Sequence, residues 1–258
     1  MDKLKATQLL RRKLLGNEYS LGSWMQLSNS SVAELMGSSG YDWVAIDAEH
    51  GSFALSELPD LFRALELGNT LPFVRVPDQN LKYCQQVLDA GAAGVIIPLI
   101  EDANTLTSII DATRWPPAGT RGVGYSRANL FGGHFERYAI EAQDPFVVAM
   151  IESKKGLMNL DEIISVPGLD AILIGPYDLS ASFGKIGLFD DPKIIEAVEE
   201  IKIRCIAQRI AIGIHVVNPS AVELQARIEE GFTFIAYSVD SVMLRLTAQN
   251  PIASKSID

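Results

Sequence analysis

The sequence predicts an α/β fold, a closed (β/α)8 TIM barrel with an N-terminal capping helix and a long loop before the fifth strand. Short apolar runs alternate with helical segments eight times along the 258 residues. That length suits a single barrel of roughly 250 residues. A doubly wound open sheet is the competing fold, but it usually stops at about five or six strands and often carries a glycine-rich phosphate turn. No such turn follows any strand expected here.

Each unit follows from the spacing of its apolar residues. Strands are expected where apolar residues run together between turn residues, and helices where they recur every three or four positions. The expected strands are 20–24, 43–47, 73–76, 94–98, 147–151, 171–174, 212–216 and 234–237. The expected helices are 1–18, 31–38, 55–67, 81–90, 103–113, 156–166, 192–208, 220–230 and one that begins at Ser241.

We expect one barrel domain over residues 1–258, with an N-terminal helix at 1–18 and a tail at 250–258, because no low-complexity segment or linker divides the chain. Residues 115–145 interrupt the alternation, since they contain no clear strand. Loops of this length in a compact domain are usually functional. The segment is rich in glycine and contains Arg121, Arg127 and His134, so the sequence predicts a wall or lid of the active site.

Composition excludes several classes of protein. The formal charge of −10 disfavours nucleic acid and anionic membranes as partners. No apolar run approaches the roughly 20 residues of a membrane span, and the N-terminus lacks the features of a secretory signal. We therefore expect a cytoplasmic protein. Cys84 and Cys205 lie far apart in the sequence and indicate two ordinary thiols, without a disulfide framework.

Two acidic residues follow consecutive buried strands. Glu152 ends the strand at 147–151, and Asp178 comes shortly after the strand at 171–174. Strands joined by a helical crossover are parallel, and neighbours lie about 5 Å apart, so the two carboxylates would leave the same edge of the barrel. Each acid alone is also explained as a helix-capping residue. Their matching positions favour a site for one hard divalent cation.

Other polar residues follow neighbouring strands. Asp47 and His50 come after the second strand, Arg75 ends the third, and His215 lies in the seventh. Barrel enzymes place their chemistry at these carboxyl ends, and a histidine beside a carboxylate is a tuned acid or base. Each residue also has an ordinary structural explanation, and His215 is more often a packed histidine. None of the eight apolar runs contains lysine, so a Schiff-base mechanism is disfavoured and a metal is the natural electrophile.

A series of sequence motifs runs along most of the chain. They are G-x-W (Gly22 to Trp24), YDW (Tyr41 to Trp43), IDAEHG (Ile46 to Gly51), VRVP (Val74 to Pro77), LDAGA (Leu88 to Ala92), RWPPAGTRGVG (Arg114 to Gly124), MIES (Met150 to Ser153) and IGPYDLS (Ile174 to Ser180). In this order they resemble the motifs of the HpcH/HpaI aldolases, which are class II, metal-dependent pyruvate aldolases of the phosphoenolpyruvate/pyruvate barrel superfamily. The resemblance extends from about Leu21 to Thr247.

The resemblance implies a divalent ion, Mg²⁺, Mn²⁺ or Co²⁺, held by Glu152 and Asp178 and chelated by pyruvate. It also implies a homohexamer, a trimer of dimers that exchange their C-terminal helices. Arg75 would contact the keto oxygen, and His50, oriented by Asp47, would exchange the proton of the C4 hydroxyl. Asp89 would reach that pair from a neighbouring subunit. The motifs also imply contacts to substrate from Trp24, Gly175 and Pro176.

The expected reaction is reversible retro-aldol cleavage of a 4-hydroxy-2-keto acid, derived from a sugar, to pyruvate and an aldehyde. Oxaloacetate decarboxylation and CoA-thioester cleavage use the same enolate chemistry and remain open, as does a non-catalytic carboxylate-binding barrel. One residue departs from the family pattern, because Met150 stands where these aldolases often have glutamine. A thioether hydrogen-bonds weakly, so the identity of the aldehyde is open.

Overall fold

A computed structural model describes residues 1–250 of the chain, so residues 251–258 of the expected tail lie outside it. Eight parallel strands form a closed barrel in sequence order, and the last pairs with the first. This confirms the predicted fold class. The strands are β1 Ser20–Met25, β2 Trp43–Asp47, β3 Leu71–Arg75, β4 Gly94–Ile97, β5 Phe146–Ile151, β6 Ala171–Ile174, β7 Ala211–Val216 and β8 Phe234–Val239.

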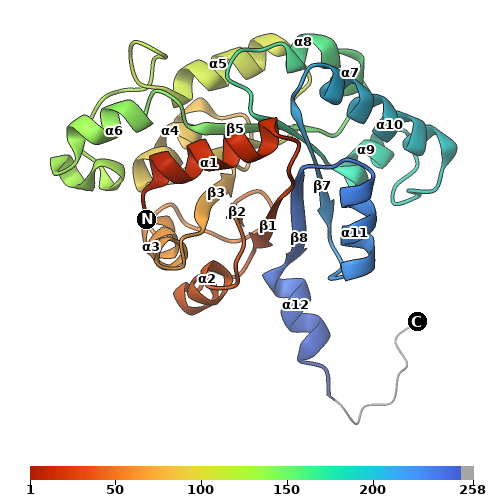
Figure 1. Ribbon diagram of the computed structural model, residues 1–258, viewed down its shortest axis with the longest axis horizontal. Coiled ribbons are helices and arrows are strands. Elements are labelled where there is room, and N and C mark those ends of the chain that lie inside the picture. The colour runs from red at the N-terminus through yellow and green to blue at the C-terminus, as the bar shows by residue number, and fades with distance from the viewer. Residues whose placement is uncertain (251–258) are drawn as a thin grey trace.

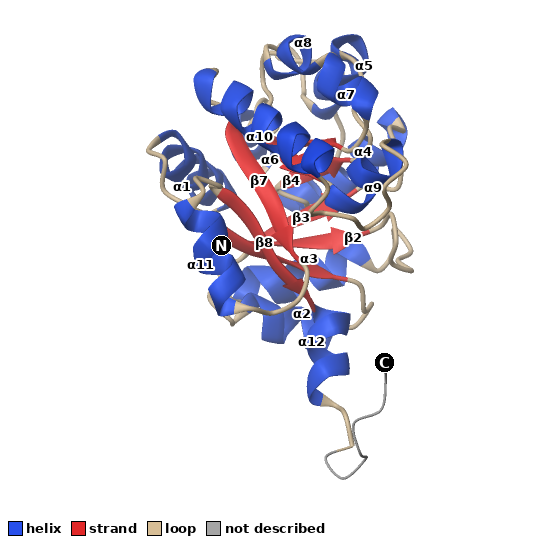
Figure 2. Ribbon diagram, turned by 90° about the vertical axis from the view of Figure 1, so that its right-hand side faces the viewer, coloured by secondary structure: helices blue, strands red, loops and turns tan. Residues whose placement is uncertain are grey.

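Helices surround the barrel, and both views show α12 projecting away from it (Figures 1 and 2). Within residues 1–250, no helix combines the length and the apolar character that a membrane crossing requires. The helices are α1 Lys3–Leu15, α2 Ser30–Gly37, α3 Leu58–Leu67, α4 Leu81–Ala90, α5 Ala103–Thr113, the 3₁₀ helix η1 Arg127–Gly132, α6 Phe135–Glu141, α7 Lys154–Met158, α8 Leu160–Ile164, α9 Pro176–Ser182, α10 Pro192–Ala207, α11 Ala221–Glu229 and α12 Asp240–Thr247.

The segment at 115–145 is not a lid over the site of its own chain, so that prediction is wrong. It connects α5 to the start of β5, contains η1 and α6, and therefore lies at the opposite end of the barrel from the carboxyl ends of the strands. Its buried Arg121 donates to the Tyr138 hydroxyl at 2.7 Å, and Arg127 pairs with Glu66 of α3 at 2.8 Å. A connection from a helix back to a strand returns the chain to this end, which the glycine content does not reveal.

Side chains of alternate strand residues fill the barrel interior, because neighbouring residues of a strand point to opposite faces. Four aromatic rings close the end nearest the strand N-termini. Trp43 stacks on Phe234 with ring centroids 4.3 Å apart, and Phe73 stacks on Phe146 at 5.2 Å. A Cβ atom at Gly22 would lie 2.1 Å from the Trp43 ring, so glycine is required beside this stack. The plug leaves the carboxyl end of the barrel as the open one.

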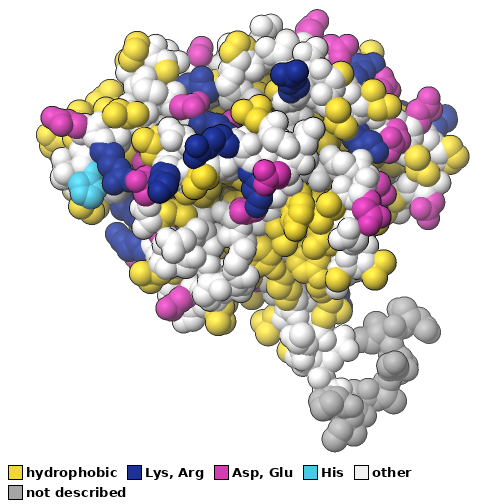
Figure 3. All heavy atoms as spheres, viewed as in Figure 1, with side chains coloured by type: hydrophobic (Ala, Val, Ile, Leu, Met, Phe, Trp, Pro, Cys, Tyr) yellow, Lys and Arg dark blue, Asp and Glu magenta, His cyan; other side chains and the backbone are white. Residues whose placement is uncertain are grey.

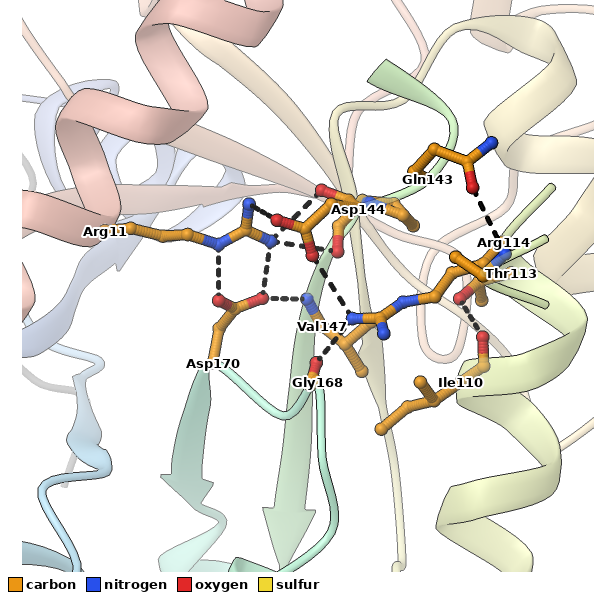
Figure 4. A network of polar contacts seen from close by, with 11 residues as sticks. Arg11, Ile110, Thr113, Arg114, Gln143, Asp144, Val147, Gly168 and Asp170 are labelled. Carbon is orange, nitrogen blue, oxygen red and sulfur yellow. Dashed lines mark hydrogen bonds and ion pairs between the residues drawn. The ribbon is translucent and has the colours of Figure 1, made fainter. Parts of the chain in front are cut away.

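An ion-pair network attaches α1 across the N-terminal end of the barrel (Figure 4). The Arg11 guanidinium donates to both Asp170 oxygens, at 2.6 and 3.0 Å, and to an Asp144 oxygen at 2.5 Å. Asp170, which immediately precedes β6, also accepts the Val147 N–H of β5 at 2.9 Å. Arg114 reaches Asp144 at 3.2 Å. The network therefore joins α1 to the start of two adjacent strands.

We expect Arg11→Ala to lower the free energy of unfolding by roughly 3 kcal/mol, because it leaves the Asp170 carboxylate buried without its partner. Arg12→Ala is the matched control, since Arg12 is exposed on the same helix and its loss should cost less than about 0.5 kcal/mol. Urea unfolding of both variants measures the difference. Equal stabilities of the two variants would show that the network does not hold the barrel together.

Candidate active site

The inward-facing rows of side chains continue past the aromatic plug into polar residues at the open end of the barrel. In β2 the row Trp43 and Ala45 continues to Asp47, and in β3 the row ending in Phe73 continues to Arg75. Asp47 and Arg75 are direct partners in the parallel register of the two strands. Barrel closure thus places a carboxylate and a guanidinium side by side without any contribution from a loop.

Asp47 and Arg75 form a buried, two-point ion pair. Arg75 Nε donates to Asp47 Oδ1 at 2.9 Å and Nη2 donates to Oδ2 at 2.8 Å. Burial alone would raise the pKa of Asp47, but the bonds and charge of Arg75, with further donors, hold it below its usual value. Arg75 also lies over the Trp24 ring, with its central carbon 4.8 Å from the ring centroid. Its remaining amino group lies 2.9 Å from Glu49 Oε2. The guanidinium plane is therefore fixed on several sides.

His50 is not oriented as the sequence predicted. The Asp47 carboxylate accepts the backbone N–H of His50 at 3.2 Å, whereas the imidazole is 60% exposed and its Nε2 lies 4.0 Å from a Glu49 oxygen. The expected bond between the Asp47 carboxylate and the His50 ring is not made, because Arg75 and Gln26 occupy that carboxylate. Asp47 therefore fixes the backbone of His50 and leaves its ring directed by other contacts.

Glu152 and Asp178 both line the pocket at the open end of the barrel, as the sequence predicted. Glu152 is 5% exposed and accepts the Leu99 N–H at 2.8 Å. Burial raises the pKa of Glu152 to about 7, the Leu99 N–H opposes this, and the charges of Glu49 and Asp178 raise it further. Asp178 lies in the first turn of α9 and is exposed. These acids thus repel one another across a shared space.

That arrangement fits a hard divalent cation, which would relieve the repulsion. Magnesium sites commonly use one or two carboxylates and leave the other positions to water and substrate. Among residues 1–250, no three or more His, Cys, Asp or Glu side chains cluster as a metal-binding group, so the two acids would form an open site. A Cβ atom at Gly175 would lie 2.2 Å from Glu152 Oε1. Glycine at this position therefore keeps one face of the carboxylate clear.

The pocket has a volume of about 340 Å³, which is within the range of small-molecule sites. It gathers eight of the nine residues that the family resemblance assigned to the site. Asp89 is the exception, because it lies half-buried on α4, outside this pocket. Burial raises the pKa of Asp89, and the charges of Arg121 and Lys82 oppose this. The eight are Trp24, Asp47, His50, Arg75, Glu152, Gly175, Pro176 and Asp178.

Sequence reasoning missed several pocket residues. Gln26 donates to Asp47 Oδ2 at 3.0 Å and accepts from the Ser241 hydroxyl at 2.9 Å. It directly follows β1, so the strand-end rule applied to the other strands would have found it. Val217, Val239 and other apolar side chains form much of the remaining wall. Apolar residues of this kind cannot be told from core residues by sequence pattern alone.

His215 lines the pocket and is packed as an uncharged residue. Its Nε2 lies 3.0 Å from the Ser238 carbonyl oxygen, and its ring centroid is 5.6 Å from that of Trp24. Burial lowers the pKa of His215 to about 4, and the Arg75 charge adds to this effect. The neutral ring therefore acts as a wall of the pocket at neutral pH.

We expect His215 to make the fold sensitive to acid. An unfolded histidine binds a proton near pH 6.5 and His215 only near pH 4, so its contribution to stability is lost as pH falls through this window. Between pH 6.5 and 5, His215→Gln should lose roughly 2 kcal/mol less stability than the wild type. His134→Gln, at an exposed position, is the control. Urea unfolding at both pH values measures the free energies of unfolding. If wild type and His215→Gln lose the same stability between the two pH values, His215 is not the acid-sensitive group.

Comparison with known proteins agrees with this geometry. The sequence profile of the HpcH/HpaI aldolase/citrate lyase family matches residues 20–246. The chain is 34% identical, over 95% of both chains, to a hydroxypyruvate/pyruvate aldolase of Roseobacter denitrificans. It is 34% identical to a 2-keto-3-deoxy-L-rhamnonate aldolase of Klebsiella pneumoniae subsp. pneumoniae, over 90% of this chain and 87% of the relative.

A solved structure has the same fold. It is an HpcH/HpaI aldolase/citrate lyase family protein from Burkholderia cenocepacia, superimposes with a TM-score of 0.86 at 31% identity, and is matched over 93% of this chain and 96% of its own. Barrel enzymes place their active sites at the carboxyl ends of the strands, where this chain places its carboxylates and Arg75. The chain belongs to the HpcH/HpaI aldolase/citrate lyase family, and it is an enzyme of the aldolase class.

Proposed function

We propose that the chain catalyses the reversible, metal-dependent cleavage of a 4-hydroxy-2-keto acid to pyruvate and an aldehyde. The observation that carries the proposal is that one pocket holds both a pair of carboxylates, Glu152 and Asp178, and the Arg75 guanidinium. The names of the curated relatives, one a hydroxypyruvate/pyruvate aldolase and one a 2-keto-3-deoxy-L-rhamnonate aldolase, support this reaction class. Because those names differ in substrate, they leave the aldehyde open.

The chain's own residues supply binding and proton transfer. Arg75, held flat by Asp47, donates hydrogen bonds to the keto acid and stabilises the enolate that forms as the C3–C4 bond breaks. His50 takes the proton of the C4 hydroxyl, whose oxygen becomes the aldehyde carbonyl. The electron pair of the broken bond remains on the pyruvate fragment, and a proton added at C3 completes pyruvate, so the overall proton balance is zero.

A divalent cation, Mg²⁺, Mn²⁺ or Co²⁺, would be held by Glu152 and Asp178 and would supply Lewis-acid stabilisation of negative charge on the keto oxygen. A cation held there would explain how a chain of net charge −10 accepts an anionic substrate, because a local positive centre would oppose the overall field.

Two related reactions use the same enolate chemistry. Oxaloacetate decarboxylation needs the same pocket, and an assay with oxaloacetate as substrate tests it. A CoA-thioester lyase needs cationic side chains for the nucleotide phosphates, and Arg75, already paired with Asp47, is the single Lys or Arg among the lining residues of the pocket. The CoA reaction is therefore the less favoured. A non-catalytic carboxylate-binding barrel would retain the pocket and release no pyruvate.

We propose that the active form is a homohexamer, a trimer of dimers that exchange their C-terminal helices. α12 projects from the barrel and leaves Leu244 and Leu246 exposed, and apolar side chains gather where it departs (Figure 3). A second copy would cover this apolar surface. Asp89, which lies outside the pocket of its own chain, would then act toward the site of a neighbour.

Glycine at position 175 should be required for cation binding. Gly175→Ala should weaken Mn²⁺ binding by about 10- to 100-fold, because the added methyl group displaces the Glu152 carboxylate, and Glu152→Gln should weaken it further. Gly124→Ala is the control, since a Cβ atom there meets no other atom within 4 Å. Electron paramagnetic resonance titration with Mn²⁺ measures the affinities. Unchanged binding in Glu152→Gln would overturn the proposed metal site.

The proposed role of His50 separates proton transfer from binding. Wild type with Mg²⁺ should release pyruvate from a racemic 4-hydroxy-2-keto acid, and EDTA should abolish this. His50→Ala should cut cleavage by about 10²- to 10⁴-fold while it keeps Mn²⁺ affinity and exchange of pyruvate C3 protons; His134→Ala is the control. Normal cleavage by His50→Ala would refute its role. Turnover of oxaloacetate alone would favour the decarboxylase.

A further inference from the structure

A second cavity, of about 380 Å³, lies directly beside the active-site pocket. Its walls come mainly from α10, α11 and β7. Pro176, Tyr177, His215 and Val217 line both spaces. The two cavities therefore share part of their lining and lie next to each other.

Just over half of the residues that line the second cavity are apolar, and they gather on its α10 side. Ile194, Ile195 and Val198 of α10 face it, together with Phe189 from the preceding loop. Tyr177 and Phe189 meet edge to face with ring centroids 4.8 Å apart, although they are 53% and 39% exposed. Large apolar side chains left exposed around a hollow are typical of a ligand-binding groove. Apolar packing, rather than hydrogen bonding, would govern affinity in such a space.

The charges around this cavity disfavour anions. Its acidic residues include Glu199, Glu223 and Glu230. Arg227, the single Lys or Arg among its lining residues, lies 2.8 Å from Glu230 and 3.7 Å from Glu223. A phosphate would meet three carboxylates, and the one guanidinium among the lining residues is already paired with two of them. On the α10 side of the cavity, Ile194, Ile195 and Val198 offer a polyhydroxylated chain no side-chain group to replace its bonds to water.

We propose that this cavity is the subsite for the distal part of the aldehyde and that it selects an uncharged, apolar chain. The inference rests on the proposed cleavage, and it narrows the product from the sugar-derived aldehyde expected from the sequence to an aliphatic or aromatic one. The short arm of the substrate remains at Arg75 and His50, and the apolar arm passes Tyr177 into the second cavity.

The synthetic direction tests this selectivity most directly. Carbon 3 of pyruvate, after loss of a proton, bonds to the carbonyl carbon of the aldehyde, and the carbonyl oxygen takes up a proton to become the C4 hydroxyl. Initial rates with Mg²⁺ and pyruvate give kcat/KM for acetaldehyde, hexanal, D-glyceraldehyde and D-glyceraldehyde 3-phosphate. We expect hexanal to exceed acetaldehyde by about tenfold or more, since each buried methylene adds to binding. The two glyceraldehydes should not exceed acetaldehyde.

A cavity-filling variant identifies the space responsible. Ile195→Trp should reduce kcat/KM for hexanal about tenfold and leave that for acetaldehyde within about twofold, because Ile195 lines the second cavity and not the active-site pocket. Ile203→Trp is the matched control, since Ile203 is exposed on the same helix and lines neither cavity. Retained activity on acetaldehyde shows that the variant is folded.

The outcomes separate the two proposals. A preference for either glyceraldehyde over hexanal, or an unchanged hexanal rate in Ile195→Trp, overturns the apolar subsite while it leaves the aldolase reaction intact. Failure of wild type to condense pyruvate with any aldehyde of the panel refutes the proposed function, and the subsite inference falls with it. Selective loss of hexanal activity in Ile195→Trp, with Ile203→Trp like wild type, supports the subsite.

Discussion

The buried ion pair between Asp47 and Arg75 is the interaction on which the rest of the site depends. The register of β2 and β3 makes the two residues direct partners, so the pair is a consequence of barrel closure. The carboxylate fixes the guanidinium plane at two points and also holds the backbone of His50. A bidentate pair of this kind combines orientation with charge, which lysine in place of Arg75 would not reproduce. The group that meets the keto acid is therefore positioned by the sheet itself.

The alternation of inward- and outward-facing side chains along the strands places both the core residues and the site residues. Every second residue of a strand points into the barrel, where Trp43, Phe73 and their aromatic partners fill the N-terminal end. Further along each strand, four positions after Trp43 and two after Phe73, the same row reaches the open end with the polar residues Asp47 and Arg75. The aromatic plug at the N-terminal end and the polar residues at the carboxyl end therefore result from the same alternation of side chains. A one-residue shift of either strand would turn its polar residue outward, among the surrounding helices.

The sequence predicted the barrel and most of the pocket because both follow from strand periodicity. The apolar runs were strong enough to locate all eight strands, and the rule that chemistry lies at their carboxyl ends found Glu152 and Asp178. Sequence reasoning failed where the place of a residue depends on which end of the barrel its loop lies at, or on which side chains it contacts. The length of segment 115–145, its glycines and its charged residues predict a wall or lid of the site, although a segment between α5 and β5 belongs to the opposite end. The His50 ring was paired with Asp47 from sequence proximity, but only the structure reveals that Arg75 and Gln26 take that carboxylate.

The buried acids of the pocket lower the stability of the fold, and the same repulsion favours binding of a cation. Glu152 is buried beside Glu49 and Asp178, so ionising it is unfavourable and its pKa rises to about 7. A folded-state pKa above the ordinary value means that stability falls as pH rises through that range. A ligand that binds only the folded chain would offset this cost by mass action. A cation between the acids would neutralise charge that the protein leaves unbalanced there, whereas Arg75 is already paired with Asp47 and Glu49. The repulsion among the acids is therefore the physical origin of the affinity proposed for this site.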